Sequence, residues 1–372
     1  MKLKIRLALV LVFSCVICVN SLALTKVEVK RQMKKVADWQ MAHFEESVHK
    51  ECKWKNAYLK DEWTQGALYV GMIEWAKLSK EEKYWDFLKG IGEELKWKPA
   101  KNIFFGDDIC VSRMYLELYD KYKKPEMIAP TIERLDYIMK NLKEVPLQMD
   151  VKGNQDRWSW ADAIFMAPPV YFKMSKVTGD AKCREFAKRE LSVTYDTLFV
   201  KADSLFLRDT NFKNKREKNG KRVYWARGNG WVVGGLANII SNLPENDPYR
   251  AKYIQLFKEM TTKIATLQGK DGFWTASLLD ASAYPVPETS STGFMTYALA
   301  WGINHGYLDK KAYAPIALKG WSALVSAIEK DGKLGWAQAI GASPEATKRE
   351  NSEVYGVGSF LLAGTEVYQL VK

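Results

Sequence analysis

The sequence has few of the residues that build metal sites, thiol chemistry or disulfide frameworks. Only three histidines, His43, His49 and His305, occur in 372 residues, and none stands in the spacing of a metal site or of a hydrolase triad. Of the five cysteines, Cys15 and Cys18 fall in the first 23 residues, and the other three, Cys52, Cys110 and Cys183, are an odd number at wide spacing, so they do not form a disulfide framework. The sequence therefore predicts no metal and no cofactor, and any proton transfer would fall to carboxylates.

Long apolar runs are absent beyond the first residues. Residues 1–23 combine a basic start, an apolar stretch and the small-residue cleavage pattern of Ser21-Leu22-Ala23, as secretion signals do. A lipoprotein signal through Cys15 is the less favoured alternative, because Val12-Phe13-Ser14 before it is a poor match to the small residues that lipoprotein signals use. We expect a periplasmic or extracellular protein with no membrane span and a single domain over residues 24–372.

Dense clusters of Lys and Arg are also lacking, although the formal charge is +12, so we do not expect nucleic acid as a partner. A basic surface favours anionic partners. Fourteen tryptophans and eighteen tyrosines, many beside Gly, Asp or Arg, suit the faces of sugar rings. Together these features indicate an acidic sugar, although an aromatic core and a solvated lysine surface explain the same composition. Nothing in the sequence indicates an oligomeric state.

Apolar residues recur with helical spacing through most of the chain, whereas alternating strand patterns stay short. Turns such as Thr178-Gly179-Asp180 separate the helices into hairpins. Two Asp-Gly turns with nearby tryptophans, at Asp271 and Asp331, suggest a repeat of about one hairpin. The twelve expected helices span residues 26–49, 62–78, 81–96, 107–122, 128–142, 160–177, 181–198, 228–242, 248–268, 290–305, 310–328 and 353–370.

The C-terminal helix decides between two arrangements of six hairpins. The segment from Glu353 to Leu370 is apolar all round and contains glycines that permit close neighbours. Such a helix does not suit the exposed end of an open solenoid. We therefore predict an all-α fold, a closed (α/α)6 barrel, with the N-terminal ends of its inner helices at one mouth.

One carboxylate stands in an unusually apolar stretch. Asp162 lies between Trp158 and Trp160 on one side and Phe165 and Met166 on the other. A charge in such surroundings costs free energy unless the charge or its proton is used. We therefore predict that Asp162 is a general acid.

A second cluster opens another expected helix, in the run from Trp225 to Trp231. Arg227 offers a planar fork for a carboxylate, with Asn229 beside it and a tryptophan at each end of the run. We expect this cluster to bind an acidic sugar. A packed helix start with Arg227 in a surface ion pair is the alternative.

Polar pairs mark two more helix starts. Asp107 and Asp108 follow a glycine, and adjacent carboxylates disfavour joint ionisation, so one of them can hold a proton. Ser290 and Ser291 offer hydroxyls and free amides that suit an anion. Both pairs also match ordinary helix caps.

These motifs together resemble a known family. The runs Asp162-x-x-x-Met166-Ala167-Pro168-Pro169 and Trp225-x-Arg227-Gly228-Asn229-Gly230-Trp231 are similar to those of the unsaturated glycuronyl hydrolases of glycoside hydrolase family 105, which include unsaturated rhamnogalacturonyl hydrolases and are related to family 88. Residues 294–304 and 355–364 resemble further segments of the family, so the similarity covers most of the chain. The resemblance implies an (α/α)6 barrel and hydration of the 4,5 double bond in a terminal unsaturated uronic acid left by a lyase.

The resemblance also implies roles for individual residues. Asp162 would protonate C4 and activate the water that adds at C5, and Asp108 would be the second catalytic aspartate, unless the alignment slips by one to Asp107. Ser290 and Ser291 would lie near the uronate carboxylate. Contacts to the sugar are implied for Asp107, Met166, Trp225, Arg227, Asn229 and Trp231.

The sequence departs from the family pattern in two places. Residues 205–212 contain no histidine, although some members have one there, and Val111-Ser112-Arg113 stands where Gly-Gln is common. These changes leave the sugar on the far side of the bond open. The galacturonic or glucuronic origin of the uronate is open as well, because the double bond removes the stereocentres at C4 and C5.

Three other functions stay open at this point. An inverting glycosidase would need two carboxyl groups roughly 6.5–9.5 Å apart, for example those of Asp108 and Asp162. A polysaccharide lyase can be built on the same barrel. A glycan-binding protein without catalysis would use the same aromatic residues.

Overall fold

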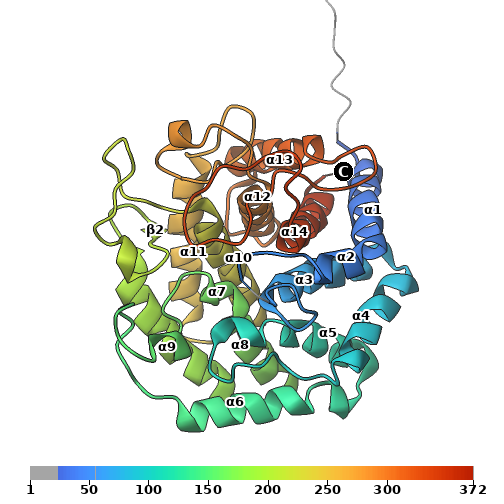
Figure 1. Ribbon diagram of the computed structural model, residues 1–372, viewed down its shortest axis with the longest axis vertical. Helices are drawn as coiled ribbons and strands as arrows, with labels where there is room; N and C mark the ends of the chain where they lie inside the picture. The colour runs from blue at the N-terminus through green and yellow to red at the C-terminus, as the bar shows by residue number, and fades with distance from the viewer. Residues whose placement is uncertain (1–23, 55, 372) are drawn as a thin grey trace, which may run out of the picture.

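The protein, described by a computed structural model over residues 24–54 and 56–371, is built from helices joined by loops (Figure 1). The predicted secretion signal lies outside the described residues. None of the helices in this part of the chain is long and apolar enough to cross a membrane. The α-helices are α1 Lys26–Ala42, α2 Phe44–Val48, α3 Trp63–Ser79, α4 Glu82–Glu94, α5 Ser112–Tyr122, α6 Ala129–Asn141, α7 Ala163–Met166, α8 Pro168–Thr178, α9 Lys182–Leu198, α10 Ala226–Asn242, α11 Arg250–Ala265, α12 Thr289–Asn304, α13 Lys310–Ser326 and α14 Val354–Leu370.

Short elements occupy the connections. Strands β1 (Phe199–Val200) and β2 (Leu205–Phe206) form a two-stranded antiparallel sheet in which Phe199 pairs with Phe206. The 3-10 helices are η1 Gly106–Ile109, η2 Pro125–Met127, η3 Asn154–Asp156, η4 Thr210–Phe212 and η5 Ala281–Ala283.

All twelve helical segments expected from the sequence are present, and three of them are interrupted. The first ends at His43 and resumes as α2. The segment expected at 107–122 begins as the tighter helix η1 before α5. The segment expected at 160–177 breaks into α7 and α8 because Pro168, at the start of α8, has no backbone N–H to continue the ladder.

Six inner helices form a closed ring. In chain order α3, α5, α8, α10, α12 and α14 each pack against the next, and α14 packs back against α3. The other long helices lie outside this ring, as α1, α6 and α9 do at the edge of Figure 1. Every residue of α12 from Thr289 to Ile303 is buried. The closed (α/α)6 barrel is therefore confirmed, and the open solenoid is not.

Glycines close the seam between the first and last inner helices. A Cβ atom at Gly358 on α14 would overlap the carbonyl oxygen of Ala67 on α3, and one at Gly71 would overlap the backbone of Gly358. The two helices thus approach through their backbones. This contact is what joins the C-terminal end of the ring to its beginning.

Replacing Gly358 with Ala is expected to lower the free energy of unfolding by about 1–3 kcal/mol, because backbone must move to admit the methyl group. Unfolding in urea measures the loss. The matched control is Gly90→Ala in α4, where no atom lies within 4 Å of the added Cβ. That change is expected to leave stability equal or raise it by up to ~1 kcal/mol. Equal effects of the two substitutions would contradict the close approach.

Candidate active site

A cavity of about 410 Å³ opens at one mouth of the barrel. Four of its lining residues are tryptophans, four are carboxylic acids and one, Arg208, is basic. This size suits one or two sugar rings. The lining residues are Trp54, Ala57, Glu62, Trp63, Asn102, Phe105, Asp107, Asp108, Trp160, Asp162, Met166, Arg208, Trp225, Ile340, Gly341 and Ala342.

Asp162 stands at the N-terminal end of α7 with a buried side chain. Its Oδ2 lies 3.8 Å from Nε of Arg208, and neither atom has a hydrogen-bond partner among the described residues. Burial raises the pKa of Asp162, while the positive charges of Arg208 and Arg227 act to lower it. The side chain is thus a carboxyl group that can hold a proton within reach of the cavity.

Arg208 is held in place from two sides. Its Nη1 donates to Oδ2 of Asp209 at 2.6 Å, and its backbone oxygen accepts from the N–H of Ala161 at 2.8 Å. Asp209 is buried and also caps η4 through the N–H of Asn211. The guanidinium group therefore faces Asp162 from a fixed position.

Asp107 is the second buried carboxyl group of the cavity. The Nε1 of Trp160 donates to its Oδ1 at 3.3 Å, and Phe105 stacks on the same indole with ring centroids 4.9 Å apart. Burial raises the pKa of Asp107 well above its usual range, and the negative charges of Asp162 and Asp108 raise it further. Asp107 and Asp162 are therefore electrically coupled, as two carboxyl groups in one site are.

Asp108 is tied to the rim instead. Its Oδ2 accepts from the backbone N–H of Asn102 at 2.5 Å. Burial raises the pKa of Asp108, whereas the Asn102 contacts and the charge of Arg134 lower it. Glu62, at the start of α3, is the fourth acid; burial and the charges of Asp108 and Asp61 raise its pKa to about 7.

These contacts separate the two adjacent aspartates. Asp107→Asn is expected to lower kcat at least tenfold more than Asp108→Asn, because only Asp107 is coupled to Asp162. Asp108→Asn is expected to act mainly on KM, through the Asn102 rim. Steady-state kinetics of the two variants provides the test. A larger loss of kcat in Asp108→Asn would instead support the assignment that the resemblance favoured.

The expected contact of the Arg227 guanidinium group with an acidic sugar is corrected by the structure. Arg227 is buried behind Trp225 and does not line the cavity. Its Nη1 donates to the carbonyl of Gln338 at 2.5 Å and its Nη2 to that of Ala339 at 2.8 Å, while the guanidinium group lies over the ring of Tyr355. Because backbone carbonyls satisfy both terminal nitrogens, Arg227 supports the loop that carries the cavity wall at residues 340–342.

Ser290 and Ser291 also lie behind this wall. Both are fully buried, and their backbone N–H groups donate to the carboxylate of Glu288, the N-cap of α12. Glu288 in turn accepts from the N–H of Gln338 at 3.0 Å. The anion at this helix start is therefore a residue of the protein itself, and the expected contact of the two serines with a uronate carboxylate is corrected.

Two more residues expected to contact sugar belong to the packing. Asn229 bonds through its side chain to both backbone groups of Phe206 and so ties α10 to β2. Trp231 is buried among Phe165, Phe294 and Tyr355 and does not line the cavity. Asp107, Asp108, Asp162, Met166 and Trp225 do line it.

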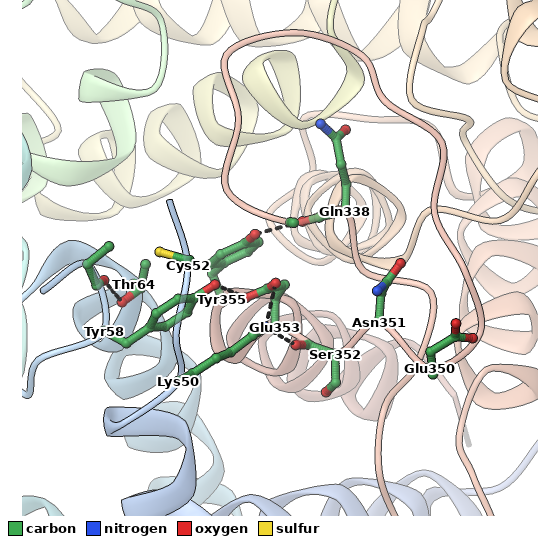
Figure 2. A network of polar contacts seen from close by, with 12 residues as sticks. Lys50, Cys52, Tyr58, Thr64, Gln338, Glu350, Asn351, Ser352, Glu353 and Tyr355 are labelled. Carbon is green, nitrogen blue, oxygen red and sulfur yellow. Dashed lines mark hydrogen bonds and ion pairs between the residues drawn. The ribbon is translucent and has the colours of Figure 1, made fainter. Parts of the chain in front are cut away.

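The opposite wall is anchored to the C-terminal part of the chain (Figure 2). Nζ of Lys50 lies 2.6 Å from Oε1 of Glu353, and the hydroxyl of Tyr58 donates to Oε2 of the same carboxylate at 2.5 Å. Thr64 donates to the carbonyl of Ala57 at 2.6 Å. These contacts anchor Lys50 and residues 57–64, the described segments on either side of Trp54, which lines the cavity.

Several residues of the cavity were not predicted from the sequence, and four of them carry charge or a large aromatic ring toward it: Trp54, Glu62, Trp63 and Arg208. Glu62 and Trp63 stand where α3 begins, at the same mouth as Asp162, so the expected helix start was the available signal. Arg208 lies in the segment where a histidine was found missing. Trp54 belongs to a loop and carried no signal.

Comparison with known proteins decides the family. The model of Glycosyl Hydrolase Family 88 matches residues 32–371. The chain belongs to this family. Glycosyl hydrolases of family 88 act on oligosaccharides that carry an unsaturated uronic acid, so the protein is a glycoside hydrolase, and the predicted relation to families 105 and 88 is confirmed.

Individual relatives and solved structures are similar to this chain over most of its length. A relative from Formosa agariphila named unsaturated 3S-rhamnoglycuronyl hydrolase is 36% identical, over 92% of this chain and 91% of its own. The structure of a family 88 glycosyl hydrolase from Bacteroides vulgatus is 28% identical with a TM-score of 0.84, covering 94% of this chain and all of the other. A structure described as a polysaccharide lyase is 31% identical with a TM-score of 0.82, over 92% and 97% of the two chains.

Proposed function

We propose that this glycoside hydrolase removes a terminal unsaturated uronyl residue from a rhamnose in lyase-generated oligosaccharides. The observation that carries the proposal is the juxtaposition of Asp162 with Arg208 in a cavity of sugar size. The named relative supports rhamnose as the neighbouring sugar.

Asp162 is the proposed acid. Protonated Asp162 gives its proton to C4 of the alkene, which forms the C4–H bond and leaves positive charge at C5 that the ring oxygen shares. Water then forms a bond to C5 and returns a proton to Asp162. The resulting hemiketal opens, and the aglycone leaves from C1. A buried carboxyl group with a raised pKa holds the proton that the first step needs.

Arg208 is the proposed partner of the uronate carboxylate. It is the single lysine or arginine among the described lining residues of the cavity. Three further acids line the same space, and an anionic sugar would be repelled if all were ionised. The raised pKa values of Glu62 and Asp107 reduce that repulsion near neutral pH.

Activity is tested with an unsaturated uronyl-rhamnose disaccharide and its hydrogenated counterpart. We expect loss of the ultraviolet absorbance of the alkene with release of rhamnose, and no turnover of the saturated compound. Cleavage of the saturated compound would indicate an ordinary glycosidase. A rise in absorbance with longer saturated substrates would indicate a lyase, the activity given for one structural relative. Binding without turnover would indicate a glycan-binding protein.

We also propose that the protein is exported. Residues 1–23 combine a basic start, an apolar stretch and a small-residue cleavage pattern, as a secretion signal does. Fractionation of producing cells, with N-terminal sequencing of the mature chain, tests this. A chain that begins at Met1 in the cytoplasm would contradict it.

A further inference from the structure

Beside the active-site cavity lies a second hollow with a different character. It measures about 320 Å³ and is lined by the segment before η1 and by helix α6, which lies at the bottom of Figure 1. Its lining includes three basic residues, Lys98, Lys101 and Arg134, against the single acid Glu133. We call this hollow the basic groove.

The basic groove begins at the rim of the active site. Lys101, Asn102 and Ile103 are consecutive exposed residues, of which Asn102 lines the cavity and the other two line the groove. The N–H of Asn102 also donates to Asp108 in the cavity. A chain of sugars that leaves the cavity over Asn102 would thus enter the groove.

The groove has a rigid floor. The Nη2 of Arg134 donates to the carbonyl of Ala100 at 3.0 Å, and its Nη1 lies 3.4 Å from that of Asn102. The hydroxyl of Tyr115 donates to the carbonyl of Lys98 at 3.0 Å. Arg134 therefore couples α6 to the rim segment and holds its own charge at the groove.

The groove also exposes apolar surface that the fold does not cover. Tyr137 is 50% and Ile103 41% exposed, and both line the groove. Phe104 packs against Tyr137, with ring centroids 6.0 Å apart, and so supports the ring. An aromatic face beside cationic groups suits a pyranose ring that carries an anionic substituent.

We propose that the basic groove is a distal subsite for the acidic sugars that follow the aglycone in a longer oligosaccharide. Lys98 and Lys101 pair with sulfate or carboxylate groups, and Tyr137 stacks on a ring. The proposal rests on the proposed function, because that function places the unsaturated end in the adjacent cavity. The sugars beyond the second one in the substrate then contribute binding free energy without taking part in the chemistry.

Chain length provides the test. Wild-type kcat/KM is expected to be about tenfold higher for an unsaturated tetrasaccharide than for the disaccharide, as about 1.4 kcal/mol of added binding gives. The double variant Lys101→Glu, Tyr137→Ala is expected to bring this ratio close to one, with the disaccharide rate within twofold of wild type. The control Lys311→Glu, an exposed lysine on α13, should keep the ratio.

The source of the negative charge is read from two tetrasaccharides, one sulfated and one desulfated but still carrying its uronates. Loss of the length effect on desulfation assigns the lysines to sulfate, and its retention assigns them to carboxylate. A wild-type ratio of one for both compounds, or equal losses on both chain lengths in the double variant, would overturn the subsite.

A wrong proposal for the function can be distinguished from a wrong proposal for the basic groove. In that case the disaccharide would not be consumed by the wild type at all. Calorimetric binding of the tetrasaccharide to the wild type and to the double variant then tests the groove by itself. Equal dissociation constants for the two proteins would contradict it.

Discussion

Asp162→Asn is expected to lower kcat on an unsaturated uronide by about 10²–10⁴, the usual contribution of a positioned acid. The amide has nearly the same shape but cannot protonate C4. Because Asp162 makes no hydrogen bond through Oδ2 among the described residues, the fold should tolerate the change, and the dissociation constant of the substrate should stay within about threefold. Loss of the alkene absorbance measures kcat, and calorimetry with the variant measures binding.

The exposed residue Asp150 provides the matched control, and Asp150→Asn should leave kcat unchanged. Turnover by Asp162→Asn at the wild-type rate would exclude Asp162 as the acid. Loss of both substrate binding and turnover in Asp162→Asn would instead assign Asp162 a structural role.

Arg208→Gln is expected to lower kcat/KM about a hundredfold, or about 2.7 kcal/mol. Removal of one member of a buried charged contact commonly costs 2–5 kcal/mol, and here the substrate carboxylate loses the cation that we assign to it. Arg208→Lys should recover part of the loss, because the charge returns without the planar fork. Arg222→Gln, which removes a half-buried partner of Asp203 outside the cavity, is the control and should have little effect.

The pH profile separates this role from a structural one. Arg208 acts to lower the pKa of Asp162, so its removal raises that pKa. The rate requires protonated Asp162 and falls as pH rises through the pKa. The basic limb of kcat/KM should therefore move to higher pH in Arg208→Gln. A basic limb at the same pH in the variant and the wild type would contradict the coupling between Arg208 and Asp162.

A substrate whose uronate is esterified tests the carboxylate contact. The substitution should lower kcat/KM for this ester far less than for the free acid, and an equal loss of kcat/KM for the two substrates would contradict the contact.

The fold could be predicted from the helical spacing of apolar residues, because the apolar faces of the helices are the faces that pack together in this chain. The glycines and apolar faces of the C-terminal helix predicted a neighbour on every side, and α14 indeed packs against α3, α12 and α13. The breaks at His43 and Pro168 were harder to place. At Pro168 the missing N–H is local information, but whether a helix kinks or restarts depends on its tertiary neighbours.

The candidate site was predicted in part, for a physical reason. Asp162 could be singled out because a carboxylate among aromatic residues is costly wherever it lies. The role of Arg227 depended on which acceptor its fork would meet, and that acceptor is the backbone of residues 338–339, more than a hundred positions away in the chain. No local pattern reports such a contact.

Arg208 illustrates the same limit from the other side. It stands in a loop after β2 with no helical spacing to mark it, and its importance arises from its distance to Asp162. Glu288 likewise occupies the helix start that the two serines were expected to offer to a ligand. Sequence patterns identified the chemistry-bearing segments, whereas the fold decided which side chains reach the cavity.

Solvent partitioning tests the central claim most directly, because the proposed chemistry attacks C5 and leaves the glycosidic bond intact in the first step. In water containing methanol, methanol should compete for C5 and yield a methyl ketal that still carries the aglycone, detectable by mass spectrometry and NMR. Asp162→Asn should form neither ketal nor hydrated product. A methyl group found at C1, with the alkene intact and the aglycone released, would contradict the account.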